Sequence, residues 1–265
     1  MQKPLPITVC TLCLNEAGNL PRCLKLREVF DEWIVLDTGS SDNSIAIAES
    51  LGARVERSLW LNFSATRRYH FSLARNRWIL WVDADEEITT AFVEELRNLL
   101  PRIEEHSAYT LNRQMFFQGK WIRHGDWFPD RVTRLFRDGD WAMPERTIHE
   151  SLTIEGSTGS LTELVPHYSY KSWADRRKRV KSYSKLWAQN EFKRGRKVGF
   201  ATPILRATWK FFRGFIFKGG ILDGWLGFEI ALSNAREVHR KYRCLRNAHT
   251  VDEFRDLESS ASQKS

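Results

Sequence analysis

The sequence predicts an α/β fold with a doubly wound, mostly parallel sheet and a C-terminal helical region. Two observations carry this prediction. Short apolar runs alternate with helical patterns over the first hundred residues, as expected for parallel strands connected by helices. The last third of the chain shows helical patterns only. We therefore expect a catalytic sheet domain at residues 5–155, a helical region at residues 156–250 and a polar tail at residues 251–265.

Four strands and four helices are expected in the first hundred residues. The strands are the apolar run at residues 7–14, typical of a buried parallel strand, and the runs at 32–38, 53–58 and 78–83. The helices are expected from about residue 20, at 44–51 before Gly52, at 64–75 and at 89–100. Thr89 or Thr90 would cap the last helix, and Pro101 would end it.

The pattern changes after residue 107. Residues 108–121 and 131–141 are predicted as strands, and the stretch from Gly156 to Ser160 as loop. Helices are predicted at residues 173–197, 203–217 and 222–242. Since no run of about 18 uncharged apolar residues is present, we expect no membrane-spanning helix. The N-terminus lacks the apolar core of a signal peptide, which favours a cytoplasmic protein.

The charge balance indicates an anionic partner. The chain holds 41 Lys and Arg against 33 Asp and Glu, and its pI is near 9.4. Such a surplus suits nucleic acid, an anionic membrane or a phosphorylated substrate. Cys10 and Cys13 lack the second pair of ligands that a zinc site would need. We therefore expect free thiols in a reducing compartment.

An acidic cluster follows the fourth predicted strand. Asp83, Asp85, Glu86 and Glu87 fall within five residues and repel one another. Asp83 and Asp85 form an Asp-x-Asp pair, and Mg²⁺ or Mn²⁺ takes carboxylate oxygens together with substrate phosphates. An acidic helix start that complements the helix dipole is the alternative. We assign that second role to Glu86 and Glu87.

Two other polar segments follow predicted strands. Asn15 and Glu16 come after the first strand, and Asp37 ends the second. Ligands of open α/β sheets bind beyond the carboxyl ends of the strands. We therefore expect these residues to share one edge of the sheet with Asp83 and Asp85, where a cation and a ligand can reach them.

Three segments resemble the family-two inverting glycosyltransferases. They read TLCLNEAGNLPRCL, VLDTGSSDNSIAIAESLGA and WILWVDADEEI, in the order and spacing of that family. The downstream segments RLFRDGDW, IHE and GGILDGWLGFEIAL are similar to one branch, the lipopolysaccharide inner-core β-1,4-glucosyltransferases. The resemblance implies a GT-A-type fold, a UDP-sugar donor and an acceptor heptose linked to lipid A.

The resemblance also implies roles for individual residues. Asp37 would contact uracil, and Asp83 would contact ribose or metal-bound water. Asp85 would bind the metal and, through it, the diphosphate. Asn15 and Glu16 would line the nucleotide pocket.

The segment FSATRRYHF resembles that family's F-x-x-x-R-N segment and adds Arg67 to the donor-binding residues. Arg68 stands where asparagine is usual, so the contact made by that asparagine is not carried over. Arg67 could instead lie on a solvated helix face, and Asp37 could be a turn acid. Asp42 is expected to cap a helix rather than bind a ligand.

An inverting transfer needs a general base that deprotonates the acceptor hydroxyl. The segment ERTIHES offers His149 and Glu150, and the resemblance selects Glu150 as the base. His149 would then position the acceptor or the diphosphate. Asp126, Asp130 and Glu145 are the alternatives for the base.

Two other functions fit parts of the sequence. A phosphatase of the Asp-x-Asp type would need Thr or Val after the pair and further downstream motifs, which we do not find. A nucleic-acid binder would explain the basic segment DRRKRVKSYSKLW but not the carboxylates after the strands. We therefore predict a metal-dependent enzyme that moves glucose from UDP-glucose to a lipopolysaccharide core heptose, or a sugar to another glycan or lipid-linked acceptor, with no nucleic-acid partner.

Residues 203–220 mix aromatic and basic side chains. The stretch is too short and too charged to cross a bilayer, but a helix of this composition can lie in the interface of an anionic membrane. A helix that packs its aromatic residues in the core is the alternative. Because the expected acceptor is lipid-linked, we favour a peripheral protein at the inner face of the cytoplasmic membrane.

Overall fold

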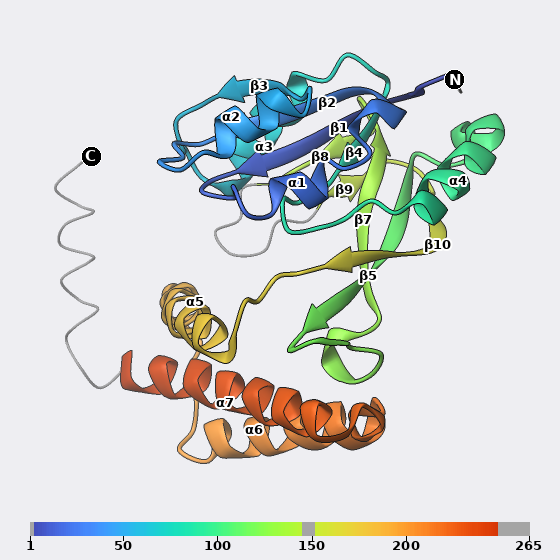
Figure 1. Cartoon of the computed structure of the whole chain (residues 1–265). Helices are drawn as coiled ribbons and strands as arrows, with labels where there is room; N and C mark the ends of the chain where they lie inside the picture. The colour runs from blue at the N-terminus through green and yellow to red at the C-terminus, as the bar shows by residue number, and fades with distance from the viewer. Residues whose placement is uncertain (1–2, 145–151, 249–265) are drawn as a thin grey trace, which may run out of the picture. The chain divides into compact units, whose positions relative to one another are not determined.

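The computed structural model describes residues 3–144 and 152–248, which form two compact units. The sheet unit holds the residues up to 116 and residues 129–169, and the helical unit holds residues 117–128 and those from 170 onward. Figure 1 traces their elements. Glu145, His149 and Glu150 lie outside the described residues, so their predicted roles stay predictions.

The sheet unit is built on strands in the order β10-β5-β7-β4-β1-β2-β3. Their bounds are β1 (Leu5–Cys13), β2 (Phe30–Asp37), β3 (Arg54–Arg57), β4 (Trp78–Trp81), β5 (Ala108–Phe117), β7 (Asp130–Arg137) and β10 (Thr158–His167). β1 is parallel to β2 and β4, β2 is parallel to β3, and β10 is parallel to β5. β7 is antiparallel to both β4 and β5. The mostly parallel sheet predicted from the sequence is therefore confirmed.

Helices cover both faces of this sheet. Their bounds are α1 (Leu20–Cys23), η1 (Arg27–Val29), α2 (Ser44–Ser50), α3 (Phe63–Ser72), α4 (Thr90–Leu99) and η2 (Leu100–Glu105). Successive side chains of a strand point to opposite faces. Accordingly, Val9 of β1 packs in one core cluster with Phe92 of α4, while Cys10 packs in a second cluster with Phe71 of α3. The chain is doubly wound, as predicted.

Two long strands expected in the middle of the chain are each interrupted by a turn. β5 ends at Phe117 because Gln118 and Gly119 have φ angles of 50° and 76°, which are turn values. β7 ends at Arg137, and Gly139 has a φ of 88°. The chain then forms β8 (Trp141–Ala142), which pairs with β9 (Thr153–Ile154).

The stretch from Gly156 to Ser160 was predicted to be a loop, but its last three residues begin β10. This strand is at the edge of the sheet, where Pro166 is tolerated because edge strands need not donate every backbone hydrogen bond. The predicted boundary after residue 155 consequently falls inside the sheet unit.

The helical unit contains the three long helices expected from the sequence. Its elements are β6 (Lys120–Trp121), η3 (Gly125–Trp127), α5 (Trp173–Lys193), α6 (Thr202–Phe212), the π-helical η4 (Arg213–Phe217), η5 (Gly220–Asp223) and α7 (Gly224–Ala248). α7 packs against both α5 and α6 (Figure 1). Gly227 is required there, since a Cβ atom would lie 1.8 Å from the carbonyl oxygen of Gly220. Within the described ranges, no helix has the length and apolarity needed to cross a bilayer.

Candidate active site

The parallel strands bring the predicted site segments to one edge of the sheet. Cys13 at the end of β1 lies opposite Asp37 at the end of β2, and the Thr38 amide donates to the Cys13 carbonyl over 3.0 Å. On the other side of β1, the Val82 amide donates to the Cys10 carbonyl over 3.1 Å. The residues after β1, β2 and β4 are therefore neighbours in space, as predicted.

The first two loops are fastened to each other by hydrogen bonds. The side-chain oxygen of Asn15 accepts from the Ser41 amide over 2.8 Å, and the Glu16 amide donates to Oγ of Ser44 over 2.8 Å. Asn15 has a φ of 57°, a left-handed conformation that asparagine tolerates better than most residues. These contacts fix Asn15 and Glu16 at the sheet edge.

Asp37 and Asp42 organise the second loop. Asp37 is buried, and its Oδ2 accepts from the amides of Gly39 and Ser40 over 2.9 and 3.1 Å. Asp42 accepts from the Ala17 amide and from the Ser44 amide, while Asn43 is the N-cap residue of α2. Hydrogen bonding, above all from the Ser44 hydroxyl, lowers the pKa of Asp42. Asp42 is thus close to its predicted capping role, one position before the cap.

Asp83 lies in a network of arginines. Its two carboxylate oxygens accept from Nη2 of Arg67 and Nη2 of Arg134, each over 2.6 Å, and from the indole of Trp81 over 2.8 Å. Burial alone would raise the pKa of Asp83, but the charges of Arg134 and Arg67 hold this pKa well below its usual range. Asp83 is therefore ionised, and its charge is already compensated within the protein.

The indole of Trp81 stacks against both arginines of this network. The guanidinium of Arg134 lies 3.8 Å from the centre of a Trp81 ring, and that of Arg67 lies 4.5 Å away. Such cation–π contacts stabilise a cation that has lost its water. Arg67 is only 6% exposed, so the alternative of a solvated helix face is wrong.

Glu86 is a member of the same network, which corrects the role predicted for it. Helix α4 begins at Thr90, and the Thr89 hydroxyl caps it by accepting from the Phe92 amide over 3.1 Å. Glu86 is buried, accepts from the Asp83 amide over 2.9 Å and pairs with Nη1 of Arg113 over 2.9 Å. It is an internal counterion and not a helix-start acid.

Glu87 is also not in the first turn of α4, and it accepts from the Tyr168 hydroxyl over 3.1 Å. The backbone beside it is held by the end of β10. The Glu87 amide donates to the Pro166 carbonyl, and the Tyr168 amide donates to the Asp85 carbonyl. This pairing brings His167 to the Asp-x-Asp turn.

Asp85 differs from Asp83 in having no arginine partner among the described residues. In that part of the chain, the basic side chain nearest to its carboxylate is His167, whose Nε2 lies 3.5 Å from Oδ1. His167 is 8% exposed, and its Nδ1 has no hydrogen-bond partner among the described residues. Asp85 and His167 are thus the pair at this edge that could bind a cation.

Sequence reasoning missed Arg113, Arg134 and His167. Arg134 opens the segment RLFRDGDW. An arginine inside a predicted strand was an available signal, because a charge at such a position needs an acidic partner. His167 is the last residue of β10, a strand that was not predicted, so nothing in the sequence pointed to it. Arg68, which replaces the usual asparagine, donates to the Met143 carbonyl over 2.8 Å.

Of the three alternative bases, the two that lie among the described residues are paired. Asp130 accepts from Nε of Arg113 over 2.9 Å. Asp126, in the helical unit, pairs with Lys210 at 3.0 Å and Arg213 at 2.7 Å. Burial would raise the pKa of Asp126, but Lys210 and Arg213 lower it, which suits a structural counterion better than a base.

The four cysteines are free thiols, as expected. Cys10, Cys13 and Cys23 are buried, and burial raises the pKa of each thiol. No group of three or more His, Cys, Asp or Glu residues suited to a metal occurs within the described part of the chain. A metal at the sheet edge would therefore depend on few protein ligands.

Ligands of open α/β sheets bind beyond the carboxyl ends of the strands, which is where these carboxylates and arginines lie. Residues 8–159, more than half of the chain, match the family described as Glycosyl transferase family 2. The chain belongs to this family. The predicted class of glycosyltransferases and the GT-A-type fold class are thereby confirmed.

Relatives carry related names. The chain is 27% identical over 240 residues to an uncharacterized glycosyltransferase of Rickettsia felis, covering 84% of this chain and 83% of that protein. It is 23% identical over 252 residues to the lipopolysaccharide core biosynthesis glycosyltransferase LpsC of Rhizobium meliloti, covering 90% of this chain and 93% of LpsC.

Among solved structures, the chain is similar to the glucosyl-3-phosphoglycerate synthase of Mycobacterium tuberculosis, in complex with Mn²⁺, UDP and glucosyl-3-phosphoglycerate. The identity is 21% and the TM-score 0.35, over 42% of this chain. The match spans less than half of that solved chain, 44%.

Proposed function

We propose that the protein transfers glucose from UDP-glucose to a heptose of a lipopolysaccharide core, with inversion and with a divalent cation. The observation that carries the proposal is that two neighbouring acids, Asp83 and Asp85, have different basic partners. Arginines already neutralise Asp83, whereas Asp85 has only His167 beside it within the described residues. The name of LpsC supports a lipopolysaccharide core acceptor over another glycan or lipid-linked acceptor.

The residues at the sheet edge fit Mg²⁺ or Mn²⁺. Asp85 and His167 would hold the cation, since Mg²⁺ binds through one or two carboxylates together with substrate phosphates, and Mn²⁺ also accepts imidazole. When bound, the cation supplies positive charge that offsets the charge developing on the departing diphosphate.

The chain's own residues would bind the donor and move the proton. Asn15, Glu16 and Asp37 would line the nucleotide pocket. The rigid pairing of Arg67 with Asp83 would fix the loop on which Asp85 stands. In the segment outside the described residues, Glu150 would take the proton of the acceptor hydroxyl, and His149 would position the acceptor or the diphosphate.

We also propose that α6 docks the protein on an anionic membrane, where a lipid-linked acceptor resides. Apolar residues on α6 and the following η4 are exposed: Leu205 by 66%, Trp209 by 58%, Phe212 by 49% and Ile216 by 47%. The first three lie four and three residues apart and share a helix face. Such an aromatic face beside basic side chains suits the membrane interface.

Another face of this segment contacts α7 through the half-buried rings of Phe211 on α6 and Phe215 on η4. The rings of Phe211 and Phe215 each lie 5.7 Å from the ring of Phe228 on α7. Residues 203–220 thus offer exposed rings for membrane docking on one face and rings that pack against α7 on another.

The transfer reaction is tested by following UDP release from UDP-glucose with purified core acceptor. We expect activity with Mn²⁺ or Mg²⁺, its loss in excess EDTA and its return when the metal is restored. A panel of UDP-sugars, analysed by mass spectrometry of the acceptor, identifies the donor. Full activity in EDTA would reject the metal, and activity with a different acceptor only would reject the heptose assignment.

A further inference from the structure

A cavity of about 640 Å³ lies in the helical unit between α5 and α7. α5 lines it with Trp173, Arg176, Arg177 and Val180, which share one helix face because they are three and four residues apart. α7 lines it along nearly its full length, from Trp225 to Cys244. Its volume is in the range of small-molecule sites.

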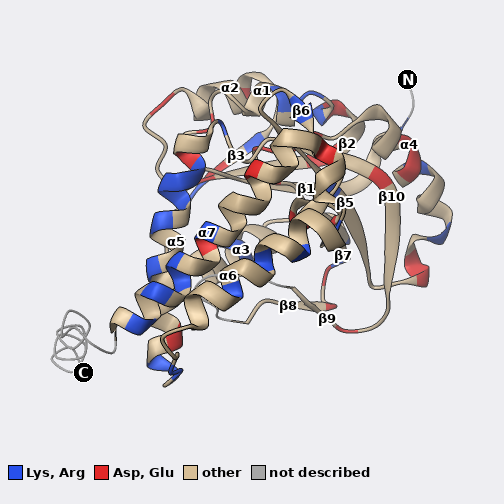
Figure 2. Cartoon of the chain, turned by 90° about the horizontal axis from the view of Figure 1, so that it is seen from below, with Lys and Arg blue, Asp and Glu red and all other residues tan. Residues whose placement is uncertain are grey.

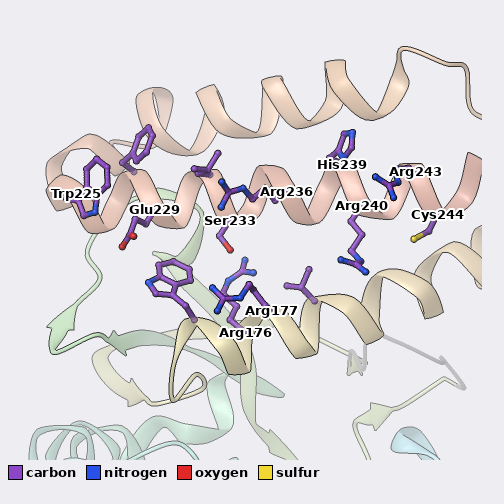
Figure 3. A pocket seen from close by; sticks show the side chains of 14 residues that line it. Arg176, Arg177, Trp225, Glu229, Ser233, Arg236, His239, Arg240, Arg243 and Cys244 are labelled. Atoms are coloured by element: carbon purple, nitrogen blue, oxygen red, sulfur yellow. The ribbon is translucent and has the colours of Figure 1, made fainter.

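Five arginines line the cavity, against a single glutamate, Glu229. They are Arg176 and Arg177 of α5 and Arg236, Arg240 and Arg243 of α7. Figure 3 shows Arg240 directed from α7 towards α5, and Arg177 directed from α5 towards α7. Like charges held this close repel one another, so a bound anion would stabilise the arrangement.

These arginines are short of anionic partners. Arg176 is 2% exposed and donates from Nη2 to Asn234 over 2.6 Å, while its buried Nε has no partner among the described residues. Within the same residues, Arg176 pairs with Glu237 at 3.4 Å, and none of the other four arginines has a carboxylate within 4 Å. A guanidinium presents its donors in a planar fork that matches phosphate oxygens.

The cavity is apolar at one end. On α7, Trp225, Phe228 and Leu232 precede the arginines, which begin at residue 236. On α5, Trp173 also lines the cavity and precedes Arg176 and Arg177 in the chain. The aromatic rings and the arginines are therefore separated along α7, with Glu229 on the side of the rings, which fits a ligand with an anionic head and an apolar body.

We infer that this groove binds the phosphate group of a phosphorylated amphiphile. A nucleic acid is the other polyanion that arginines and aromatic rings accept, but it alternates phosphates and bases along its length. The groove has its arginines at one end and its aromatic rings at the other. This site goes beyond the transfer reaction and beyond membrane docking by α6, because a monomeric lipid binds to it without donor, metal or bilayer.

The test uses dihexanoyl phosphatidic acid below its critical micelle concentration, titrated calorimetrically into the whole protein. We expect it to bind, and the triple change Arg177→Gln, Arg236→Gln, Arg240→Gln to weaken binding at least about tenfold. The matched control is Lys178→Gln, Lys181→Gln, Lys185→Gln, which removes the same charge from exposed residues of α5 outside the cavity. Figure 2 marks the Lys and Arg positions along α5 in blue. The control should lose less than about threefold.

A second variant separates a specific site from general attraction. Arg177→Lys, Arg236→Lys, Arg240→Lys keeps the charge but removes the planar fork, so binding should still weaken by several fold. The site is overturned if the arginine-to-glutamine triple and the control Lys178→Gln, Lys181→Gln, Lys185→Gln lose equal affinity for the lipid. The lipid assignment is overturned if inorganic phosphate binds as tightly as the lipid, if dihexanoyl phosphatidylcholine binds equally well, or if a short RNA competes with equal affinity.

Discussion

The two units use arginine in opposite ways. In the sheet unit, Arg67 and Arg134 are buried, pair with Asp83 and stack on Trp81. Their positive charges are therefore compensated inside the protein. In the helical unit, Arg236 and Arg240 face a cavity and have no carboxylate partner among the described residues. The basic surplus of the sequence therefore has two separate roles in the structure. Part of it builds a rigid site, and part of it remains available to an anion.

The largest effect on the rate of transfer is expected at Asp85, the acid without an arginine partner among the described residues. Asp85→Ala removes the carboxylate that would hold the cation, and such a cation contributes several kcal/mol to charge stabilisation in the transition state. Transfer should fall at least about 10³-fold while the fold is kept. The measurement is UDP release at saturating Mn²⁺, with Glu49→Ala, an exposed acid of α2, as the control. Near-normal turnover of Asp85→Ala would reject the metal role.

Glu150→Gln keeps the shape of the predicted base and removes its ability to accept a proton. General-base catalysis contributes about 10²- to 10⁴-fold, so turnover should fall by that amount while UDP affinity is kept. Calorimetric titration with UDP separates the outcomes. A collapse of UDP binding would place Glu150 in the donor site. Unchanged turnover would move the search to Glu145 and Asp130, although Asp130 is already paired with Arg113.

The adjacent acids Glu86 and Glu87 have different roles. Glu86 is an internal counterion of Arg113, and Glu87 accepts a hydrogen bond from the Tyr168 hydroxyl. Glu86→Gln removes the buried charge that pairs with Arg113, while Arg113 keeps its pair with Asp130, so the cost should be about 2–3 kcal/mol. Glu87→Gln alters only a hydrogen bond from Tyr168 and should cost about 1 kcal/mol. Urea unfolding of both variants measures the difference. Equal losses of a few tenths of a kcal/mol would instead fit two helix-start acids.

The sequence predicted the part of the site that follows strands. Asn15, Asp37, Asp83 and Asp85 come directly after apolar runs, and parallel pairing of those strands made their common edge predictable. The partners of these acids could not be predicted in the same way. Arg134 and His167 reach the edge from β7 and β10, and β10 is a polar edge strand whose pattern resembles a loop. Which carboxylates arginines neutralise depends on this long-range pairing.

The smallest expected effect is on membrane docking, and it sharpens the comparison within the helical unit itself. Trp209→Ser with Phe212→Ser removes two exposed rings from α6, so partitioning onto vesicles of phosphatidylcholine and phosphatidylglycerol should weaken by about tenfold or less. The paired control is Phe211→Ser with Phe215→Ser, whose rings contact Phe228 and whose loss should instead lower the thermal unfolding temperature. Raising the salt concentration should weaken docking of the wild type, because headgroup attraction is screened. If the wild type does not sediment with these vesicles at low salt, α6 does not dock on membranes. If Trp209→Ser with Phe212→Ser unfolds the unit as its control does, the exposed face belongs to a packed interface.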